Sequence, residues 1–435
     1  MLVVWVALLA FLMLGCTPSA PPPEPPKQEA FHDPPPVPSP NRKFAGTTLT
    51  YYGERSGSGV VLEEKLLKRF TEDTGINVTY IPRPQSASEC YAAYQRLFQA
   101  QTADVDLMMV DIIWPAAFAQ HLVDLTPHMN VKGILPQMIA SATVDGQLVA
   151  MPGYQSAGML FYRTDLLQKY GFDHPPKTWD ELESMSRTIQ EGERKTNRRF
   201  VGFVWQGYTY EGRTCNALEW QVSHDGGAIF DAEGHVQVQT PGARQAFLRA
   251  AAWIGTISPP GVTGYQEEDV RHVFEGGNAA FMRHWPYCVG SGNEPHSLIR
   301  GKFDVTTLPG NPPASTLGAW LWAISRYSQH QEAALELVRY ETCPEVQLWR
   351  AIEGAFLPTR MELYEEPSLL EKMPFCKTMP AIFRSTVLRP SLVTKDLYNE
   401  ASSIYYQGVA EILQGGDADT ALAKMDRDLK ELMQP

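Results

Sequence analysis

Apolar stretches of two lengths alternate along residues 49–110, and this alternation constrains the fold more than any other feature of the chain. The short stretches are typical of strands. The longer stretches, in which apolar residues recur about every four positions, are typical of amphipathic helices. Strands are predicted at 49–52, 76–80 and 105–110, and helices at 60–72 and 88–101. A β-α-β-α-β order predicts a mainly parallel sheet with helices on both faces.

The rest of the chain continues the pattern and becomes mostly helical in its last third. Further strands are predicted at 147–151, 158–162 and 200–205. Thr178 and Glu181 have capping-box spacing, and Pro241 after Thr240 suits the first position of a helix. Helices are therefore predicted to begin at these two positions, and further helices are predicted at 329–342, 344–353, 396–414 and 417–432. The chain is therefore predicted to be α/β.

Length and charge limit the classes of function. The chain has 435 residues, of which 44% are hydrophobic and 20% charged, as in soluble globular proteins. Its net charge of −12 argues against a nucleic-acid-binding protein, because phosphates are neutralised by clustered Lys and Arg.

The N-terminus predicts export and a lipid anchor. Residues 2–14 form an apolar run that is too short to span a bilayer but has the length of a signal-peptide core. Met13-Leu14-Gly15-Cys16 resembles a bacterial lipobox, which makes 1–15 a lipoprotein signal peptide and Cys16 the lipidated residue. The prolines of 16–43 predict an extended tether.

The motifs of common enzymes and cofactor sites are incomplete. Gly57-Ser58-Gly59 resembles a dinucleotide-binding loop, but Leu62 replaces its third glycine. Tyr154 replaces the first glycine of a hydrolase nucleophile elbow around Ser156. Cysteines and histidines lack metal-ligand spacing. We expect no cofactor, no metal and no catalytic residue, although two carboxylates of a glycosidase cannot be recognised by spacing.

Aromatic residues instead stand beside polar ones in predicted loops at strand ends. Flat rings cover the apolar faces of a sugar, and charged or amide side chains bind its hydroxyls. The clearest groups are Asp111 with Trp114, Trp205 to Tyr208, Arg283 to Tyr287, and Trp320 with Trp322.

At these segments the chain resembles the family 1 extracellular solute-binding proteins of ABC sugar importers, especially their trehalose/maltose-binding-like branch. The resemblance runs from about Thr48 to the C-terminus. The segments that carry it include Asp111-Ile112-Ile113-Trp114-Pro115, Tyr162-Arg163-Thr164-Asp165-Leu166-Leu167, Pro175-Pro176-Lys177-Thr178-Trp179-Asp180-Glu181-Leu182, Ser315-Thr316-Leu317-Gly318-Ala319-Trp320 and Arg389-Pro390.

The resemblance implies a two-lobed periplasmic-binding-protein-like fold of the maltose-binding (type II) kind, with the ligand in a cleft between the lobes. The N-lobe is expected at 44–153 and 278–316, and the C-lobe at 154–277 and 317–435. The implied partners are a small carbohydrate, the permease subunits of an ABC importer and, indirectly, its ATPase subunits. A monomer is expected.

The resemblance also implies ligand contacts. It assigns them to Asp111, Tyr154, Trp285, Tyr287, Trp320 and Arg389, with Glu54 and Gln85 as further candidates. Ser156 replaces an Asp of close relatives, which exchanges a charged acceptor for a neutral hydroxyl, and charge-assisted hydrogen bonds are roughly twice as strong.

The sequence therefore predicts a membrane-anchored extracytoplasmic lipoprotein that binds a small sugar, a disaccharide or related glycoside, and delivers it to an importer without reacting it. The membrane contact is the lipid anchor. Two alternatives from other classes remain open: a secreted glycoside-acting enzyme, and a structural or adhesive lipoprotein.

Overall fold

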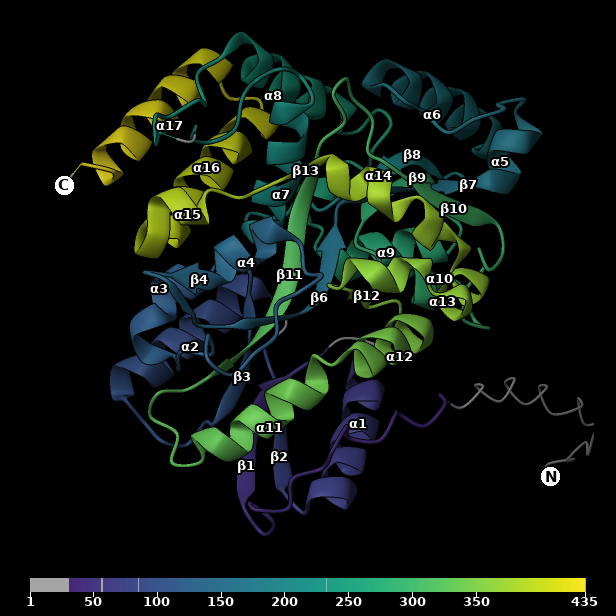
Figure 1. Ribbon diagram of the computed structural model, residues 1–435. Helices are drawn as coiled ribbons and strands as arrows, with labels where there is room; N and C mark the ends of the chain where they lie inside the picture. The colour runs from purple at the N-terminus through teal and green to yellow at the C-terminus, as the bar shows by residue number, and fades with distance from the viewer. Residues whose placement is uncertain (1–30, 56–57, 85, 232, 435) are drawn as a thin grey trace, which may run out of the picture. The chain divides into compact units, whose positions relative to one another are not determined.

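The computed structural model describes residues 31–434 except 56–57, 85 and 232, and these residues form one compact unit (Figure 1). The predicted Cys16 anchor, the signal peptide 1–15 and Gln85 lie outside the described residues. No helix within the described part of the chain has the length and apolarity that a bilayer crossing needs.

Strands and helices alternate through the first half of the chain. Its strands are β1 (Thr48–Gly53), β2 (Asn77–Pro82), β3 (Leu107–Asp111), β4 (Thr143–Val144), β5 (Gln147–Leu148), β6 (Met151–Ala157), β7 (Met159–Arg163) and β8 (Val201–Val204). Its helices are α1 (Ser58–Thr74), α2 (Ala87–Ala100), α3 (Pro115–Phe118), α4 (Pro136–Ala142), α5 (Thr164–Lys169), α6 (Trp179–Glu193) and α7 (Glu211–Val222), with the 3₁₀ turn η1 (Ala119–His121).

Helices dominate the second half. Its strands are β9 (Ala279–His284), β10 (Phe303–Thr306), β11 (Ser315–Ile324), β12 (Leu357–Pro358) and β13 (Thr386–Val387). Its helices are α8 (Pro241–Trp253), α9 (Glu267–Glu275), α10 (Cys288–Gly292), α11 (Gln331–Glu341), α12 (Pro344–Gly354), α13 (Pro367–Lys372), α14 (Met379–Arg384), α15 (Ser391–Thr394), α16 (Tyr398–Leu413) and α17 (Ala418–Leu432). The 3₁₀ turns are η2 (Val262–Gly264), η3 (Met361–Glu365), η4 (Pro374–Lys377) and η5 (Lys395–Leu397).

The predicted α/β alternation is confirmed, and local signals explain where helices begin and end. Gly75 has φ +77°, which ends α1 in a conformation that a side chain would strain. Thr178 accepts a hydrogen bond from the Glu181 N–H and so caps α6 as its spacing predicts. Pro241 lies in the first turn of α8, after the cap Thr240.

The first sheet is mixed rather than purely parallel. Its strand order is β12-β6-β11-β3-β1-β2, and β13 pairs with β11. The first three strands of the chain are parallel, as the β-α-β-α-β order predicts, whereas β11 is antiparallel to both β3 and β6. The second sheet has the order β10-β7-β9-β8, with β8 and β9 parallel and the other pairs antiparallel.

Strand pairing corrects the predicted division into lobes. The segment 278–316 was assigned to the N-lobe, but β9 and β10 belong to the second sheet, with β7 and β8. The segment 317–435 was assigned to the C-lobe, but most of β11 pairs with β3 and β6, and α11 and α12 pack into the core of the first sheet. Because strand partners are set by contacts between distant parts of the chain, the apolar runs did not reveal them.

The two sheets have separate cores joined by crossing segments. One cluster of buried side chains covers β1, β2 and β3 with α1, α2, α11 and α12; two others cover the second sheet with α6, α7, α8 and α16, and with α9, α13 and α14. The chain passes from the first sheet to the second where β6 meets β7, and β11 returns alongside β6 (Figure 1). Two lobes joined in this way form the predicted maltose-binding-protein-like fold.

The end of the proline-rich segment lies against the first lobe. Residues 31–40 contain no helix or strand, as predicted for a tether. However, the Val37 N–H donates to Asp73 at 2.8 Å, the Tyr340 hydroxyl donates to the Pro35 carbonyl at 2.5 Å, and Trp349 Nε1 donates to the His32 carbonyl at 3.2 Å. This stretch is therefore part of the folded body rather than a free linker.

Candidate functional site

A cavity of about 160 Å³ lies where the two lobes face each other. Aromatic, charged and small residues from both lobes line it. Those that the argument below uses are Glu54, Arg83, Asp111, Tyr154, Ser156, Tyr210, Glu211, Glu267, Glu268, Trp285, Tyr287, Gly318, Trp320 and Arg389.

The first-lobe wall is built by strand register. Trp320 on β11 is paired with Asp111 at the carboxyl end of β3 on one side and with Tyr154 on β6 on the other. Residues directly opposite in an antiparallel pair point to the same face of a sheet, so the three side chains form one row. Glu54 follows β1 directly, and the Tyr154 hydroxyl donates to its Oε2 at 2.6 Å.

Ser156 extends this row by two residues along β6. It is paired with Gly318 of β11, and a Cβ atom at Gly318 would lie 2.5 Å from the Ser156 hydroxyl oxygen and 3.5 Å from the Trp285 ring. Glycine is therefore the residue that lets Ser156 and Trp285 approach each other. No elbow or helix follows Ser156, since β6 continues to Ala157.

The wall of the second lobe is formed by the turn after β9 and by the first residues of helices α7 and α9. Trp285 and Tyr287 directly follow β9, and the Tyr287 hydroxyl donates to Glu268 at 3.0 Å. Glu211 begins α7, and Glu267 begins α9. Carboxylates at the first turn of a helix face its partial positive charge, which stabilises them there.

Arg389 joins the two walls. Its Nη2 lies 2.9 Å from Asp111 Oδ1 of the first lobe, and its Nη1 lies 2.9 Å from Glu211 Oε1 of the second. Glu211 also accepts hydrogen bonds from the hydroxyls of Tyr398 and Ser402. Burial raises the pKa of Glu211, and the Arg389 guanidinium opposes this rise by favouring the ionised carboxylate.

An arginine covers one side of each tryptophan of the cavity. The Arg83 Cζ lies 3.6 Å from the centre of the Trp320 ring, and the Arg283 Cζ lies 4.0 Å from that of Trp285. Both distances are within the range of a cation–π contact. Each arginine is in turn ion-paired, Arg83 with Glu54 and Arg283 with Glu219.

Cysteine and histidine near the site are buried and neutral. Burial lowers the pKa of His284 to about 4, and burial raises the pKa of the Cys288 thiol well above its usual value. Their Nδ1 and Sγ atoms lie 2.8 Å apart beneath the Trp285–Tyr287 turn. A neutral pair of this kind supports the turn and is not arranged as a thiolate nucleophile.

The ligand contacts that the resemblance implies come together within the described chain. Of the aromatic groups that the sequence singled out, however, Trp114, Trp205 and Trp322 are buried in the cores and do not line the cavity. Asp111, Tyr154, Ser156, Trp285, Tyr287, Trp320, Arg389 and Glu54 all line the one cavity. Sequence reasoning missed Arg83, Tyr210, Glu211, Glu267 and Glu268. Arg83 follows the predicted strand at 76–80, and a charged residue at that position is a signal that could have revealed it; the others resemble ordinary helix-start residues.

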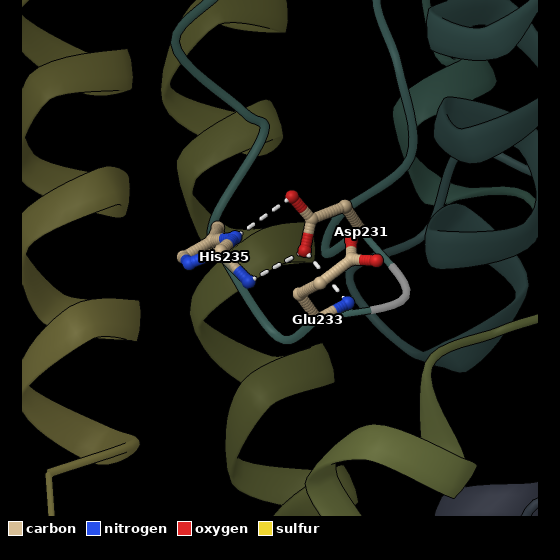
Figure 2. Close-up of side chains that lie close together, drawn as sticks. All are labelled: Asp231, Glu233 and His235. Carbon is tan, nitrogen blue, oxygen red and sulfur yellow. Dashed lines mark hydrogen bonds and ion pairs between the residues drawn. The ribbon is translucent and has the colours of Figure 1, made fainter.

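A second cluster lies apart from the cavity. Figure 2 shows Asp231, Glu233 and His235, whose potential ligand atoms all lie within 4.8 Å of one another. The Asp231 carboxylate already accepts the backbone N–H groups of Glu233 at 3.1 Å and His235 at 2.8 Å. Because these bonds close a turn in the chain, we assign no metal site to the cluster.

The lobes and the cavity between them define the class of two-lobed solute-binding proteins. Residues 53–348 match the model of the bacterial extracellular solute-binding protein family, and the chain belongs to that family. Such proteins bind a small ligand outside the cytoplasm and deliver it to ABC permeases; they are not enzymes.

Individual relatives agree. The chain is 42% identical to a probable ABC transporter-binding protein of Deinococcus radiodurans over 84% of this chain and 89% of the relative. It is similar to maltose-bound MalE3 of T. maritima, with 36% identity, a TM-score of 0.85 and coverage of 89% and 100% of the two chains. A tagatose-bound protein of Thermotoga lettingae shares the fold at 23% identity, with a TM-score of 0.80 and coverage of 89% and 100%.

Proposed function

We propose that the protein binds a small sugar, a disaccharide or related glycoside, in the cavity between its lobes and delivers it to an ABC importer. The observation that carries this proposal is the meeting of Asp111, Trp285, Trp320 and Arg389 at one cavity. Two indole rings suit the C–H faces of a sugar, and a carboxylate and a guanidinium suit its hydroxyls.

The similarity to a maltose-bound protein at 36% identity supports a ligand of disaccharide type and the trehalose/maltose-like branch. Ser156, in place of the acidic residue of close relatives, means either that the hydroxyl pattern of the sugar differs from that of trehalose or maltose, or that a water molecule fills the gap. The ligand contacts in this proposal are Glu54, Asp111, Tyr154, Ser156, Trp285, Tyr287, Trp320 and Arg389.

Binding acts through closure of the two lobes. A ligand that touches both walls stabilises the closed arrangement by the contacts that only this arrangement offers. Arg389 already spans the walls, so closure and ligand binding use the same charged groups. The permease then recognises the closed form.

The proposal includes a lipid anchor at Cys16 and export by the signal peptide 1–15. Residues 31–40 lie on the first lobe, so a tether to the membrane would lie N-terminal to them. We propose that the protein stays at the membrane as a monomer.

A thermal-shift screen of maltose, trehalose, tagatose, ribitol and mannitol tests the ligand class. At least one sugar should raise the melting temperature, and calorimetry should then give one ligand for each protein with no product formed. Turnover of the sugar would instead support a glycoside-acting enzyme, and a screen without any shift would contradict carbohydrate binding.

The site itself is tested by Trp285→Ala. Loss of a stacking face should weaken binding by about 1–3 kcal/mol. Trp179→Phe, within the core of the second lobe and away from the cavity, is the matched control and should leave the affinity unchanged. Equal affinity of Trp285→Ala and the wild type would remove Trp285 from the site.

A further inference from the structure

Five carboxylates line the cavity, and they differ in their partners. Four of them form ion pairs with arginine: Glu54 with Arg83, Asp111 and Glu211 with Arg389, and Glu268 with Arg271. The fifth, Glu267, has no ion pair with any residue that the structure describes. Arg283 is near enough to favour the charge of Glu267 without forming an ion pair with it. A buried ionised carboxylate without an ion pair is costly unless hydrogen-bond donors surround it.

The hydrogen bonds that hold the Glu267 carboxylate in place come from neutral donors, while the nearby Arg283 guanidinium also favours its ionised form. The Tyr210 hydroxyl donates to its Oε2 at 2.6 Å, and the Trp285 indole N–H also stabilises its ionised form. The main chain is fixed as well, because His284 Nε2 lies 2.9 Å from the Glu267 carbonyl oxygen. Glu267 is therefore a positioned acceptor rather than a mobile surface acid.

Glu267 and Ser156 flank the same ring. The Trp285 benzene edge lies next to the Ser156 hydroxyl, since both lie within 3.5 Å of the Cβ position at Gly318. The indole N–H, which is on the other edge of that ring, faces Glu267. The carboxyl group that Ser156 does not supply at one edge of the Trp285 ring is thus present at the other.

We propose that Glu267 is a ligand-binding, specificity-determining residue that accepts a hydrogen bond from a donor group of the ligand, either a hydroxyl or a protonated amine. The proposal rests on the proposed carbohydrate-binding function and deepens it. A carboxylate accepts only, so an ammonium or hydroxyl satisfies it, whereas a phosphate or carboxylate of an acidic sugar is repelled.

The electrostatics of the cavity agree with this assignment. Burial raises the pKa of Glu267, while the hydrogen bond from Tyr210 opposes that rise. A donor group of the ligand would act in the same direction as Tyr210, because it too favours the ionised form. The carboxylate is therefore better satisfied with a neutral or cationic ligand than without one.

Calorimetry with a matched series of sugars tests the proposal: trehalose, maltose, the cationic trehalosamine and the anionic trehalose 6-phosphate. The wild type should bind the neutral or the cationic sugar and discriminate against the phosphate. Glu267→Gln keeps the shape of the side chain but removes its charge. It should weaken the affinity for the neutral sugar roughly tenfold and the affinity for trehalosamine by more than that. It should also reduce the discrimination against trehalose 6-phosphate. Glu191→Gln, an exposed acid on α6, is the matched control and should behave as the wild type.

Unchanged affinities in Glu267→Gln, or a wild type that prefers trehalose 6-phosphate, would overturn the proposal. Tryptophan fluorescence separates its failure from failure of the carbohydrate function, because it needs no ligand. On acidification, protonation of Glu267 should change the emission of Trp285 in the wild type, and the change should be absent from both Glu267→Gln and Trp285→Phe. If no sugar binds but the fluorescence change is seen, the carbohydrate function has failed and the positioned carboxylate stands; if no change is seen, the carboxylate assignment has failed.

Discussion

The two tryptophans of the cavity are supported in different ways. Trp320 belongs to β11, which is hydrogen-bonded to β3 on one side and to β6 on the other. Trp285 follows the last residue of β9 and lies in a turn. The backbone of a central strand therefore fixes Trp320, whereas Trp285 depends on side chains beneath it.

The arginines behind the two rings reflect this difference. Arg283 donates from two nitrogens to Glu219, at 2.9 and 2.5 Å, and both side chains are only 1% exposed. Glu219 also accepts the Thr316 N–H of β11 at 3.0 Å. Arg83 Nη2 lies 3.3 Å from Glu54 Oε1. The ring on the turn has the stronger ionic support, so the protein compensates for missing backbone pairing with a buried ion pair.

The largest effect that tests this comparison is expected for Arg283→Gln. It leaves the Glu219 carboxylate buried without its cation, and breaking a buried pair in this way costs about 3–5 kcal/mol. Urea denaturation at pH 7 measures the free energy of unfolding. Arg244→Gln, which breaks an exposed pair with Asp419, is the control and should lose less than about 1 kcal/mol. Similar losses in the two variants would show that the pair behind Trp285 is not a structural support.

Acidification should also destabilise the Trp285 side. Burial holds the pKa of His284 at about 4 in the folded protein, against about 6.5 when unfolded, with Arg283 and Arg271 also disfavouring its charge and Glu268 favouring it. Between these values the unfolded chain binds a proton that folded His284 does not, so the free energy of unfolding falls as the pH decreases from 6.5 to 4, by about 3 kcal/mol in total.

His284→Asn isolates this contribution from the carboxylates, which titrate in both proteins. The stability advantage of the wild type over the variant should be largest at pH 7 and should shrink by about 3 kcal/mol at pH 4. Denaturation curves across this range measure the difference. A constant difference would mean that the pKa of His284 is the same in the folded and the unfolded protein, so that burial does not disfavour its charge.

The sequence predicted local structure well and long-range pairing poorly. Periodic apolar residues identified β1, α1 and β2, because their signals lie within a few residues of one another. The buried runs of β9 and β11 could fit either sheet, and the choice between sheets depends on partner strands that are distant in the sequence. The lobe division at 278–316 and 317–435 came from the resemblance rather than from these runs, and strand pairing corrects it.

The same distinction applies to the site. The rings of Trp285 and Trp320 and the carboxylate of Asp111 stood out where aromatic and polar residues are neighbours, and the family resemblance added Arg389. Glu267 did not stand out, because an acid in the first turn of a helix is ordinary helix-dipole chemistry. Only the folded chain shows that this acid lacks an arginine partner among the described residues while its neighbours have one.

The smallest expected effect, on the Trp320 side, is that of Arg83→Gln. Glu54 would keep its hydrogen bonds from the Tyr154 hydroxyl at 2.6 Å and from the Arg55 N–H at 2.7 Å, so its charge would not be left without donors. We expect Arg83→Gln to lower the free energy of unfolding by about 1–2 kcal/mol, which is less than the loss expected for Arg283→Gln. The same urea titrations measure this loss, with Arg244→Gln as the control. Because β11 holds Trp320 through its backbone, the near-ultraviolet circular dichroism of the folded variant should match that of the wild type. A loss of stability as large as that of Arg283→Gln would mean that the strand alone does not fix the Trp320 ring. Both tryptophan rings would then depend on the arginines that cover them.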